Sequence, residues 1–344
     1  MNIIEARGLS KTFKHAIKEP GLRGAVKHLF KPHHVTKAAV NRIDLTVQAG
    51  EAVAYVGPNG AGKSTTLKML TGILVPSSGE VRVNGLDPHR QRVENARRIG
   101  AVFGQRTQLW WDIPIQESFS LLKDIYEIPA QQYKSNLDTF TELLGMEEFL
   151  HLSARKLSLG QRMRADLAAA LLHNPDIVYL DEPTIGLDIA VKLKIREFIL
   201  HMNQTQKTTM MLTTHDLGDI ENLCRRLVII DRGSIIYDGS LQSVKDRFAK
   251  ERRIHFQLAE PNAVLMDNLE RDTSIHIIQT PDKDSDGRQL CVSFDRFTIS
   301  ASEVTSRVMQ HGEIIDFRIE EPDIEQVIKA VYERELDMSQ PGTA

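Results

Sequence analysis

A glycine-rich segment carries the clearest chemical signal in this sequence. It consists of Gly57, Pro58, Asn59, Gly60, Ala61, Gly62, Lys63, Ser64 and Thr65, between an apolar run and a helical pattern that ends near Leu70. In such a loop the backbone N–H groups turn towards phosphate oxygens, and the helix N-terminus favours the same negative charge. We therefore predict a phosphate site, with Lys63 at the β and γ phosphates of a nucleotide and the Ser64 hydroxyl on Mg²⁺. A plain strand-to-helix corner is the alternative.

Two acidic residues, Asp181 and Glu182, directly follow a second apolar run, residues 177–180. Strands often end in acidic turn residues, so this pair alone is weak evidence for a site. Beside a phosphate loop, however, two carboxylates suit phosphoryl chemistry, in which one binds Mg²⁺ through water and the other lies beside the attacking water. We predict Asp181 as the acid on the metal and Glu182 as the catalytic base.

Short apolar runs must position these residues. Residues 51–56, 99–103, 177–180 and 210–213 form such runs, each ending in Gly, Asp or Thr, with helical patterns between them. This alternation predicts buried parallel strands with helical crossovers, the α/β fold of a P-loop NTPase. Residues 115–150 follow a helical pattern and predict a helical insertion, within a helical subdomain of about residues 108–172.

A different pattern begins after the charged stretch at residues 248–253. Alternating apolar residues then predict the order strand, helix, strand, strand, helix, strand, with a final helix from Asp323, which is close to a split βαβ plan. A chain of 344 residues also fits one large domain and one smaller one. We predict a large domain with the phosphate loop at 1–248 and a small ferredoxin-like α+β domain at 249–344.

Composition narrows the function classes. A formal charge of -3 gives no basic field of the kind that dominates nucleic-acid binding, so nucleic acid is not favoured as a partner. The two cysteines, Cys224 and Cys291, have no metal-type spacing and fit a reducing cytosol. The N-terminus does not have the pattern of a signal peptide, and no apolar stretch is long enough to cross a bilayer, so we expect a partner to supply any membrane span.

A family resemblance rests first on Leu157-Ser158-Leu159-Gly160-Gln161, about 20 residues ahead of Asp181 and directly before a helical pattern. The chain resembles the ATPases of ABC transporters, whose signature is usually Leu-Ser-Gly-Gly-Gln. By itself, a serine at this place is equally an ordinary helix N-cap. The resemblance implies that Ser158, Leu159, Gly160 and Gln161 contact the γ-phosphate held by the opposite subunit. Leu159 departs from the family pattern, which leaves the geometry of that contact open.

Three further residues match the family in order and spacing, and the resemblance spans roughly residues 1–245. It implies that Gln105 reaches Mg²⁺ and the attacking water while touching the transport subunit. Asp188, in Gly186-Leu187-Asp188, would be the acid that links the two ATPase halves. His215 would hold the γ-phosphate. ATP and Mg²⁺ are accordingly the expected nucleotide and metal.

Residues from about 14 to 37 form an insertion that a minimal ABC ATPase lacks. The stretch 11–37 is basic, and its apolar residues at near-helical spacing suggest an amphipathic helix for anionic lipid headgroups or the transport subunit. A solvated basic loop is the alternative. In this family an aromatic near the N-terminus stacks on adenine; Phe13 is best placed for it, with Phe30 as the alternative.

Trp110 and Trp111, the only tryptophans, closely follow Gln105. In the family this region contacts the membrane subunit, so we expect both tryptophans in that contact; packing in the core is the alternative.

Taken together, the resemblance implies an ATP-hydrolysing transporter subunit on the cytoplasmic side of the membrane. It would pair with a second ATPase subunit, identical or a paralogue, and with a polytopic permease. The stretch 320–327 resembles the C-terminal domain of drug-resistance export ATPases, so export is favoured over import. A non-transport ABC ATPase would need tandem halves, a coiled coil or zinc-binding cysteines. A P-loop GTPase or a small-molecule kinase has no use for the signature, Gln105 and His215 together.

Overall fold

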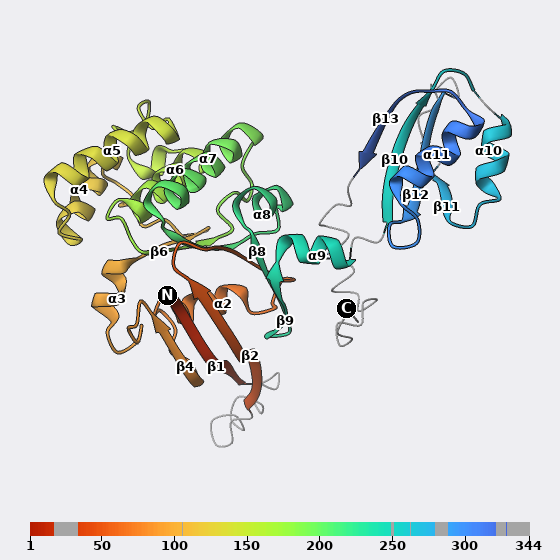
Figure 1. Ribbon diagram of the computed structural model, residues 1–344. Helices are drawn as coiled ribbons and strands as arrows, with labels where there is room; N and C mark the ends of the chain where they lie inside the picture. Colours follow the sequence, from red (N-terminus) through yellow and green to blue (C-terminus); the bar gives the residue numbers. More distant parts are fainter. Residues whose placement is uncertain are drawn as a thin grey trace, which may run out of the picture. The chain divides into compact units, whose positions relative to one another are not determined.

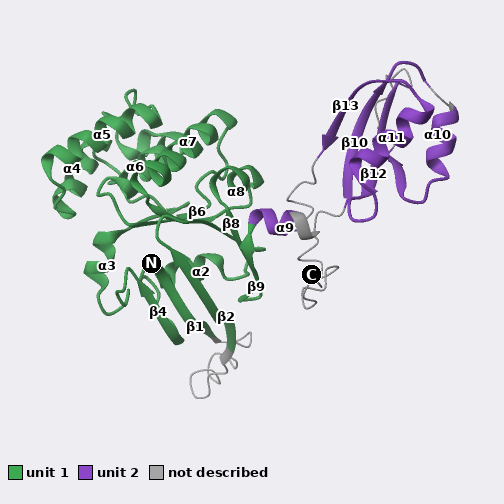
Figure 2. Ribbon diagram, in the orientation of Figure 1, with its two compact units in different colours: residues 1–240 green, residues 241–344 purple. Residues whose placement is uncertain are grey.

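The computed structural model describes residues 1–16, 34–104, 106–248, 251–261, 263–278, 288–320 and 328 (Figure 1). The chain forms two compact units, Met1–Ser240 and Leu241–Ala344, each with its own core (Figure 2).

A six-stranded sheet forms the centre of the first unit, in the order β5-β6-β7-β3-β8-β9. Its strands are β3 (Ala52–Val56), β5 (Ile99–Phe103), β6 (Ile177–Asp181), β7 (Thr209–Thr213), β8 (Arg226–Asp231) and β9 (Ser234–Ser240). All neighbours pair in parallel except β8 and β9. β7 is buried along its whole length, as expected for a strand covered on both faces. The predicted parallel sheet is therefore confirmed, and the carboxyl ends of β6 and β7 lie beside that of β3.

A second, antiparallel sheet in this unit has the order β2-β1-β4 and consists of β1 (Asn2–Ala16), β2 (His34–Gln48) and β4 (Ser78–Val83). Helix α2 (Lys63–Leu70) contacts β2 and β4 as well as β6 of the larger sheet. One apolar cluster joins the two sheets through α2; among its members are Leu9, Tyr55, Leu67, Val81 and Tyr179. The helix that follows the glycine-rich loop is thus fixed on both sides.

The other α-helices described in this unit are α3 (Arg92–Arg98), α4 (Ile115–Ile125), α5 (Ala130–Leu144), α6 (Leu159–Leu171), α7 (Ile189–Gln206) and α8 (Leu217–Leu223). Between β5 and β6 the chain is helical, as predicted, and α4, α5 and α6 gather beside α7 (Figure 1). The helix after Ser158 begins at Leu159, three residues earlier than the sequence pattern suggests, because Ser158 caps it.

The second unit begins with α9 (Leu241–Phe248) and contains an antiparallel sheet in the order β11-β12-β10-β13. Its strands are β10 (Glu251–Leu258), β11 (Ile275–Ile278), β12 (Gln289–Asp295) and β13 (Ile314–Glu320). Helices α10 (Ala263–Glu270) and α11 (Ala301–His311) pack on one face and close an apolar core. This order of strands and helices is the predicted ferredoxin-like plan. The helix predicted from Asp323 lies almost entirely outside the described residues.

Within the described ranges, no helix combines the length and the apolar character that a membrane crossing requires.

Candidate active site

The phosphate loop joins the end of β3 to the start of α2, as predicted. Gly62 has a φ of 113°, and a Cβ there would meet the Ala39 carbonyl oxygen at 2.5 Å. At Gly57, a Cβ would meet the Ile230 carbonyl oxygen at 2.3 Å. Both positions therefore need glycine, because a side chain would collide with fixed backbone. The loop is held tightly against β2 and β8 and keeps a concave shape.

Lys63 is 8% exposed and its ammonium group lies inside the loop. Its Nζ donates to the Gly57 carbonyl oxygen and, at 3.4 Å, to that of Pro58. Burial lowers the pKa of Lys63, while the charges of Glu182 and then Asp181 act in the opposite direction. A cation bonded to backbone carbonyls and influenced by the charges of two carboxylates is placed to meet a polyphosphate.

Asp181 ends β6 and receives two hydroxyl groups on its Oδ1 atom. The Ser64 hydroxyl donates to it at 3.2 Å and the Thr213 hydroxyl at 2.5 Å. A carboxylate next to a hydroxyl at a phosphate loop is a donor set that fits Mg²⁺, which takes oxygen ligands and binds through one or two protein groups plus phosphate and water. Asp181 and Ser64 are the residues that would hold the metal.

Glu182 follows Asp181 in a left-handed backbone conformation, with a φ of 56°. Such conformations are uncommon for residues other than glycine and cluster at functional sites. The Glu182 N–H donates to the Thr213 carbonyl oxygen at 3.0 Å, which fixes this turn to β7. His215 Nε2 then lies 3.3 Å from Glu182 Oε1, from Lys63 Nζ and from Asn59 Oδ1. The structure thus brings four predicted site residues together around one point.

A cleft of about 540 Å³ opens at this point. It is lined by Pro58, Asn59, Gly60, Gly62, Lys63, Ser64, Thr65, Asp181 and Glu182 of the predicted set, and also by Ala39, Lys68, Ile73, Phe103, Gly104, Arg106 and Ile185. Arg106 adds a positive charge to the lining of the cleft, and no sequence motif pointed to this residue.

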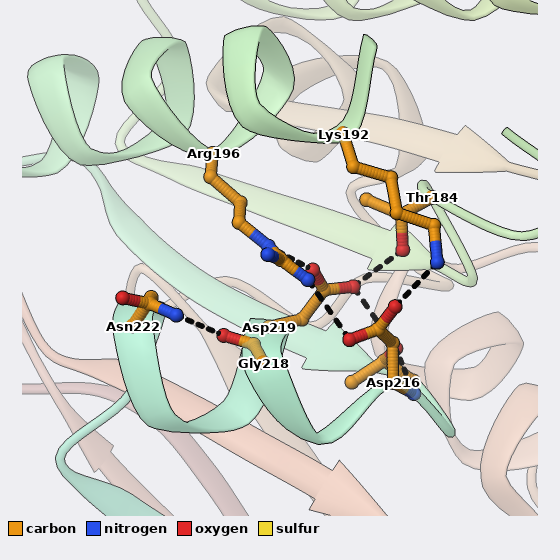
Figure 3. Close-up of polar contacts among 8 residues, drawn as sticks. Thr184, Lys192, Arg196, Asp216, Gly218, Asp219 and Asn222 are labelled. Atoms are coloured by element: carbon orange, nitrogen blue, oxygen red, sulfur yellow. Dashed lines mark hydrogen bonds and ion pairs between the residues drawn. The ribbon is translucent and has the colours of Figure 1, made fainter. Parts of the chain in front are cut away.

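A partly buried ionic network adjoins the turn that carries His215, and no sequence motif pointed to it; Figure 3 shows its members Thr184, Lys192, Arg196, Asp216 and Asp219. Arg196, on α7, donates to Asp219 at 2.6 Å and to Asp216 at 2.8 Å, and Lys192 donates to Asp216 at 2.5 Å. Thr184, in the turn after Glu182, donates to Asp219, whose side chain is fully buried. Burial alone would raise the pKa of Asp216, but Lys192 and Arg196 hold it below its ordinary value. The network ties the turns around Glu182 and His215 to α7.

The signature residues form a capping box at the start of α6. The Gln161 N–H donates to Ser158 Oγ at 3.2 Å, and the Ser158 N–H donates to Gln161 Oε1 at 2.9 Å. Leu159, the departure from the family pattern, is 46% exposed and lies beside Gly186. These residues do not line the cleft of their own chain. Asp188 caps α7 by accepting from the Val191 N–H at 2.9 Å.

Gln105 itself lies outside the described residues, but the segment after it is anchored to α6. The Thr107 hydroxyl and the Gln108 N–H donate to Asp166 Oδ1 at 2.8 Å and 3.1 Å. Burial raises the pKa of Asp166 to about 6, against the effect of these two hydrogen bonds and of Arg162. Asp166 was also missed from the sequence, where it stands in an alanine-rich helical stretch.

Both tryptophans of this segment are on the surface. Trp110 is 39% exposed and Trp111 is 48% exposed, with the Arg162 guanidinium 4.9 Å from the Trp111 ring centre. Packing of this pair in the core, the alternative considered from the sequence, is therefore wrong.

Phe13 lies on β1, opposite Lys37, and is 36% exposed. Its ring centre is 5.4 Å from Lys11 Nζ, and it does not line the described cleft. Phe30 and most of the basic insertion lie outside the described residues.

Comparisons with known proteins identify the family of this chain. A model of the ABC transporter family matches residues 40–185. The chain is 35% identical over 206 residues to the ABC transporter ATP-binding protein NatA of Bacillus subtilis, covering 60% of this chain and 83% of NatA. It is 34% identical over 207 residues to the methionine import ATP-binding protein MetN 2 of Enterococcus faecalis, covering 59% of this chain and 60% of that protein.

Among solved structures, a dimeric ATP-binding cassette in a post-hydrolysis state with ADP and phosphate superposes with a TM-score of 0.57. It is 25% identical in sequence, and the match covers 69% of this chain and 98% of that one. The phosphate loop, the two acids after β6 and the histidine after β7 thus lie in a chain that belongs to the ATP-binding proteins of ABC transporters, a family of ATPases.

Proposed function

We propose that this ATPase drives transport through a separate polytopic permease and works as a dimer on the cytoplasmic side of the membrane. The proposal rests on one observation: the predicted site residues fall into two groups, one at the cleft and one away from it. Lys63, Asp181 and Glu182 converge on one cleft, whereas Ser158 and Gly160 do not line it. Each cleft is completed by the signature of the second copy, which is either identical or a paralogue.

Each residue of the cleft has a role in this proposal. Lys63 binds the β and γ phosphates of ATP, and Mg²⁺, when bound by Ser64, Asp181 and Gln105, offsets their negative charge. Glu182 orients the attacking water and accepts its proton, as a carboxylate within reach of that water can. His215, 3.3 Å from Glu182, contacts the γ-phosphate.

The surface around the signature supports pairing of two copies. Leu159, Ile185, Ile189 and Leu193 are 46%, 55%, 79% and 50% exposed, and they lie in or near the signature and the Asp188 turn. Exposed apolar residues in one region are typical of protein interaction sites. ATP between the two copies would favour the closed dimer, and hydrolysis would release it.

The region after Gln105 is the proposed contact with the permease. Trp110 and Trp111 offer exposed aromatic surface there, and Asp166 joins their segment to the helix that carries the signature. Aromatic residues are enriched at protein interfaces. The motion of the helix that carries the signature, when the dimer closes, would be transmitted through Asp166 to the membrane subunit.

For the direction of transport we propose export, because the stretch 320–327 resembles the C-terminal domain of drug-resistance export ATPases. Because one relative is named for methionine import, the direction of transport has to be measured. ATP-driven uptake of substrate into inverted vesicles that contain the permease would support export, and transport only in right-side-out vesicles would refute it.

The test of the mechanism is Glu182→Gln in the full chain. This variant keeps the size of the side chain but removes the base, so we expect ATP to remain bound in the closed pair of ATP sites and turnover to fall at least about 100-fold. Normal turnover would refute the role of Glu182. Glu197→Gln, a neutral change on α7 outside the cleft, is the control and should leave turnover unchanged.

A further inference from the structure

Among the described residues, no strand pairs with the outer edge of β13, and the Phe317 N–H of this strand donates to Asp316 Oδ1 at 2.8 Å. β13 is the last strand of the sheet and pairs with β10 alone among the described strands. An edge strand presents unpaired N–H and C=O groups, and proteins usually cover or interrupt such an edge because it can pair with another chain. The pairing with β10 shifts at Ile314, and the strand runs regularly from Asp316 to Glu320.

Apolar side chains lie along this open edge. Ile315, Phe317 and Ile319 are 62%, 45% and 39% exposed. Phe317 pairs with Phe256 of β10 and Ile319 pairs with Ile254, and both partners are buried in the core. Directly paired residues share a face of the sheet, so Phe317 and Ile319 lie on the helix-covered face and extend the core to the edge. Such a strip is stabilised when a further strand covers it.

Charged side chains alternate with the apolar ones. Asp316 and Arg318 are exposed and pair with Gln257 and His255 of β10. They therefore share the face away from the helices, with Phe317 between them in sequence. An antiparallel copy of the strand centred on Phe317 would place each Asp316 opposite an Arg318.

We propose that β13 pairs antiparallel with β13 of a second copy of this chain, about a two-fold axis at Phe317. This register sets Phe317 against its own counterpart, Ile315 against Ile319, and Asp316 against Arg318 twice. Opposite charges and apolar residues in directly opposed positions stabilise a strand pair. The contact is isologous and closes with two copies, so it does not propagate into a fibre.

Neighbouring registers are disfavoured by the same residues. Centring the pair on Arg318 opposes the two Arg318 side chains and places Asp316 opposite Glu320. Centring it on Asp316 opposes the two Asp316 side chains. Of these three registers, only the one centred on Phe317 matches charge, so the alternation of Asp316 and Arg318 favours it over the other two.

This contact goes beyond the proposed function, because it needs no nucleotide. The two sheets would become one continuous sheet and join the copies while their ATP sites are open. A lasting link of this kind raises the effective concentration of one ATPase unit near the other. The contact therefore keeps the pair assembled between rounds of hydrolysis.

Sedimentation of the full chain without nucleotide tests the proposal through charge reversals. We expect the wild type to dimerise, and we expect Asp316→Arg and Arg318→Asp each to raise the dissociation constant at least about tenfold, since each places like charges opposite one another twice. The double variant restores both pairs and should dimerise again. A mixture of the two single variants should form heterodimers, because one chain is then basic and the other acidic at these positions.

Glu270→Arg, a reversal on the exposed end of α10 away from the edge, is the matched control and should leave the dimer intact. A monomeric wild type, single variants that dimerise like the wild type, or a failure of both the double variant and the mixture to recover would each overturn the proposal. Lys63→Ala separates this contact from the ATP site, because it abolishes ATP turnover and leaves the nucleotide-free dimer unchanged.

Discussion

Asp166 offers a sharp test of how burial affects a charge in this structure. Its side chain is buried in α6, and its Oδ1 atom accepts both the Thr107 hydroxyl and the Gln108 N–H. An asparagine has nearly the same shape, and its oxygen can accept the same two bonds. Asp166→Asn therefore removes the charge and keeps the contacts with the segment after Gln105.

The expected effect follows from the pKa. Burial raises the pKa of Asp166 from 3.8 to about 6, so the folded state holds this proton more tightly than the unfolded state. The stability that this group contributes is fully present below about pH 4 and is lost as the pH rises through about 6. A shift of about two units corresponds to about 3 kcal/mol. Relative to the wild type, Asp166→Asn should thus gain about 3 kcal/mol between pH 4 and pH 7.

Urea unfolding at several pH values measures this difference. Trp110 and Trp111 are the only tryptophans, so their fluorescence reports on the first unit alone. Asp112→Asn, at a carboxylate 73% exposed, is the control and should change stability by less than about 0.5 kcal/mol at neutral pH. A difference between Asp166→Asn and the wild type that stays constant from pH 4 to pH 7 would contradict this account of Asp166.

Two further predictions concern the ion pair between Arg196 and Asp219 and the exposed tryptophans. Arg196→Met leaves the buried Asp219 carboxylate without its cation, so we expect a loss of about 3 kcal/mol in the free energy of unfolding of the first unit. A loss below about 1 kcal/mol in urea unfolding would show that the network is dispensable. Replacing Trp110 and Trp111 by Ala should abolish permease-stimulated ATP turnover and spare basal turnover, since both side chains are exposed; a failure to fold would instead give them a structural role.

Much of the catalytic unit was predictable because its signals are local. The strand at Ala52–Val56, the glycine-rich loop and the helix after it adjoin one another, and each limits what its neighbour can be. The two acids after β6 follow the same logic, since the carboxyl ends of parallel strands share one edge of the sheet. The ferredoxin-like plan was also predictable, because segments with alternating apolar residues, typical of strands, follow or precede segments with helical spacing along residues 251–320.

Other features depend on contacts between distant residues and leave no local trace. The left-handed backbone of Glu182 is fixed by a hydrogen bond to Thr213, on another strand. In the sequence, Asp166 stands in an alanine-rich helical stretch and resembles a surface residue. Its burial becomes evident only from its contacts with Thr107 and Gln108. The antiparallel sheet of β1, β2 and β4 pairs strands across intervening residues, so no short pattern defines its registers.

Mixing two inactive chains tests most directly whether each ATP site is completed by the signature of a second copy. Lys63→Ala removes the phosphate cation, and Ser158→Arg blocks the signature. In a mixed dimer, one site combines an intact Lys63 from one chain with an intact Ser158 from the other. We predict that the mixture recovers ATP turnover, up to about one quarter of the wild-type rate, since about half the dimers are mixed and each has one complete site of two. If both chains fold and dimerise yet their mixture remains as inactive as each chain alone, the claim is contradicted.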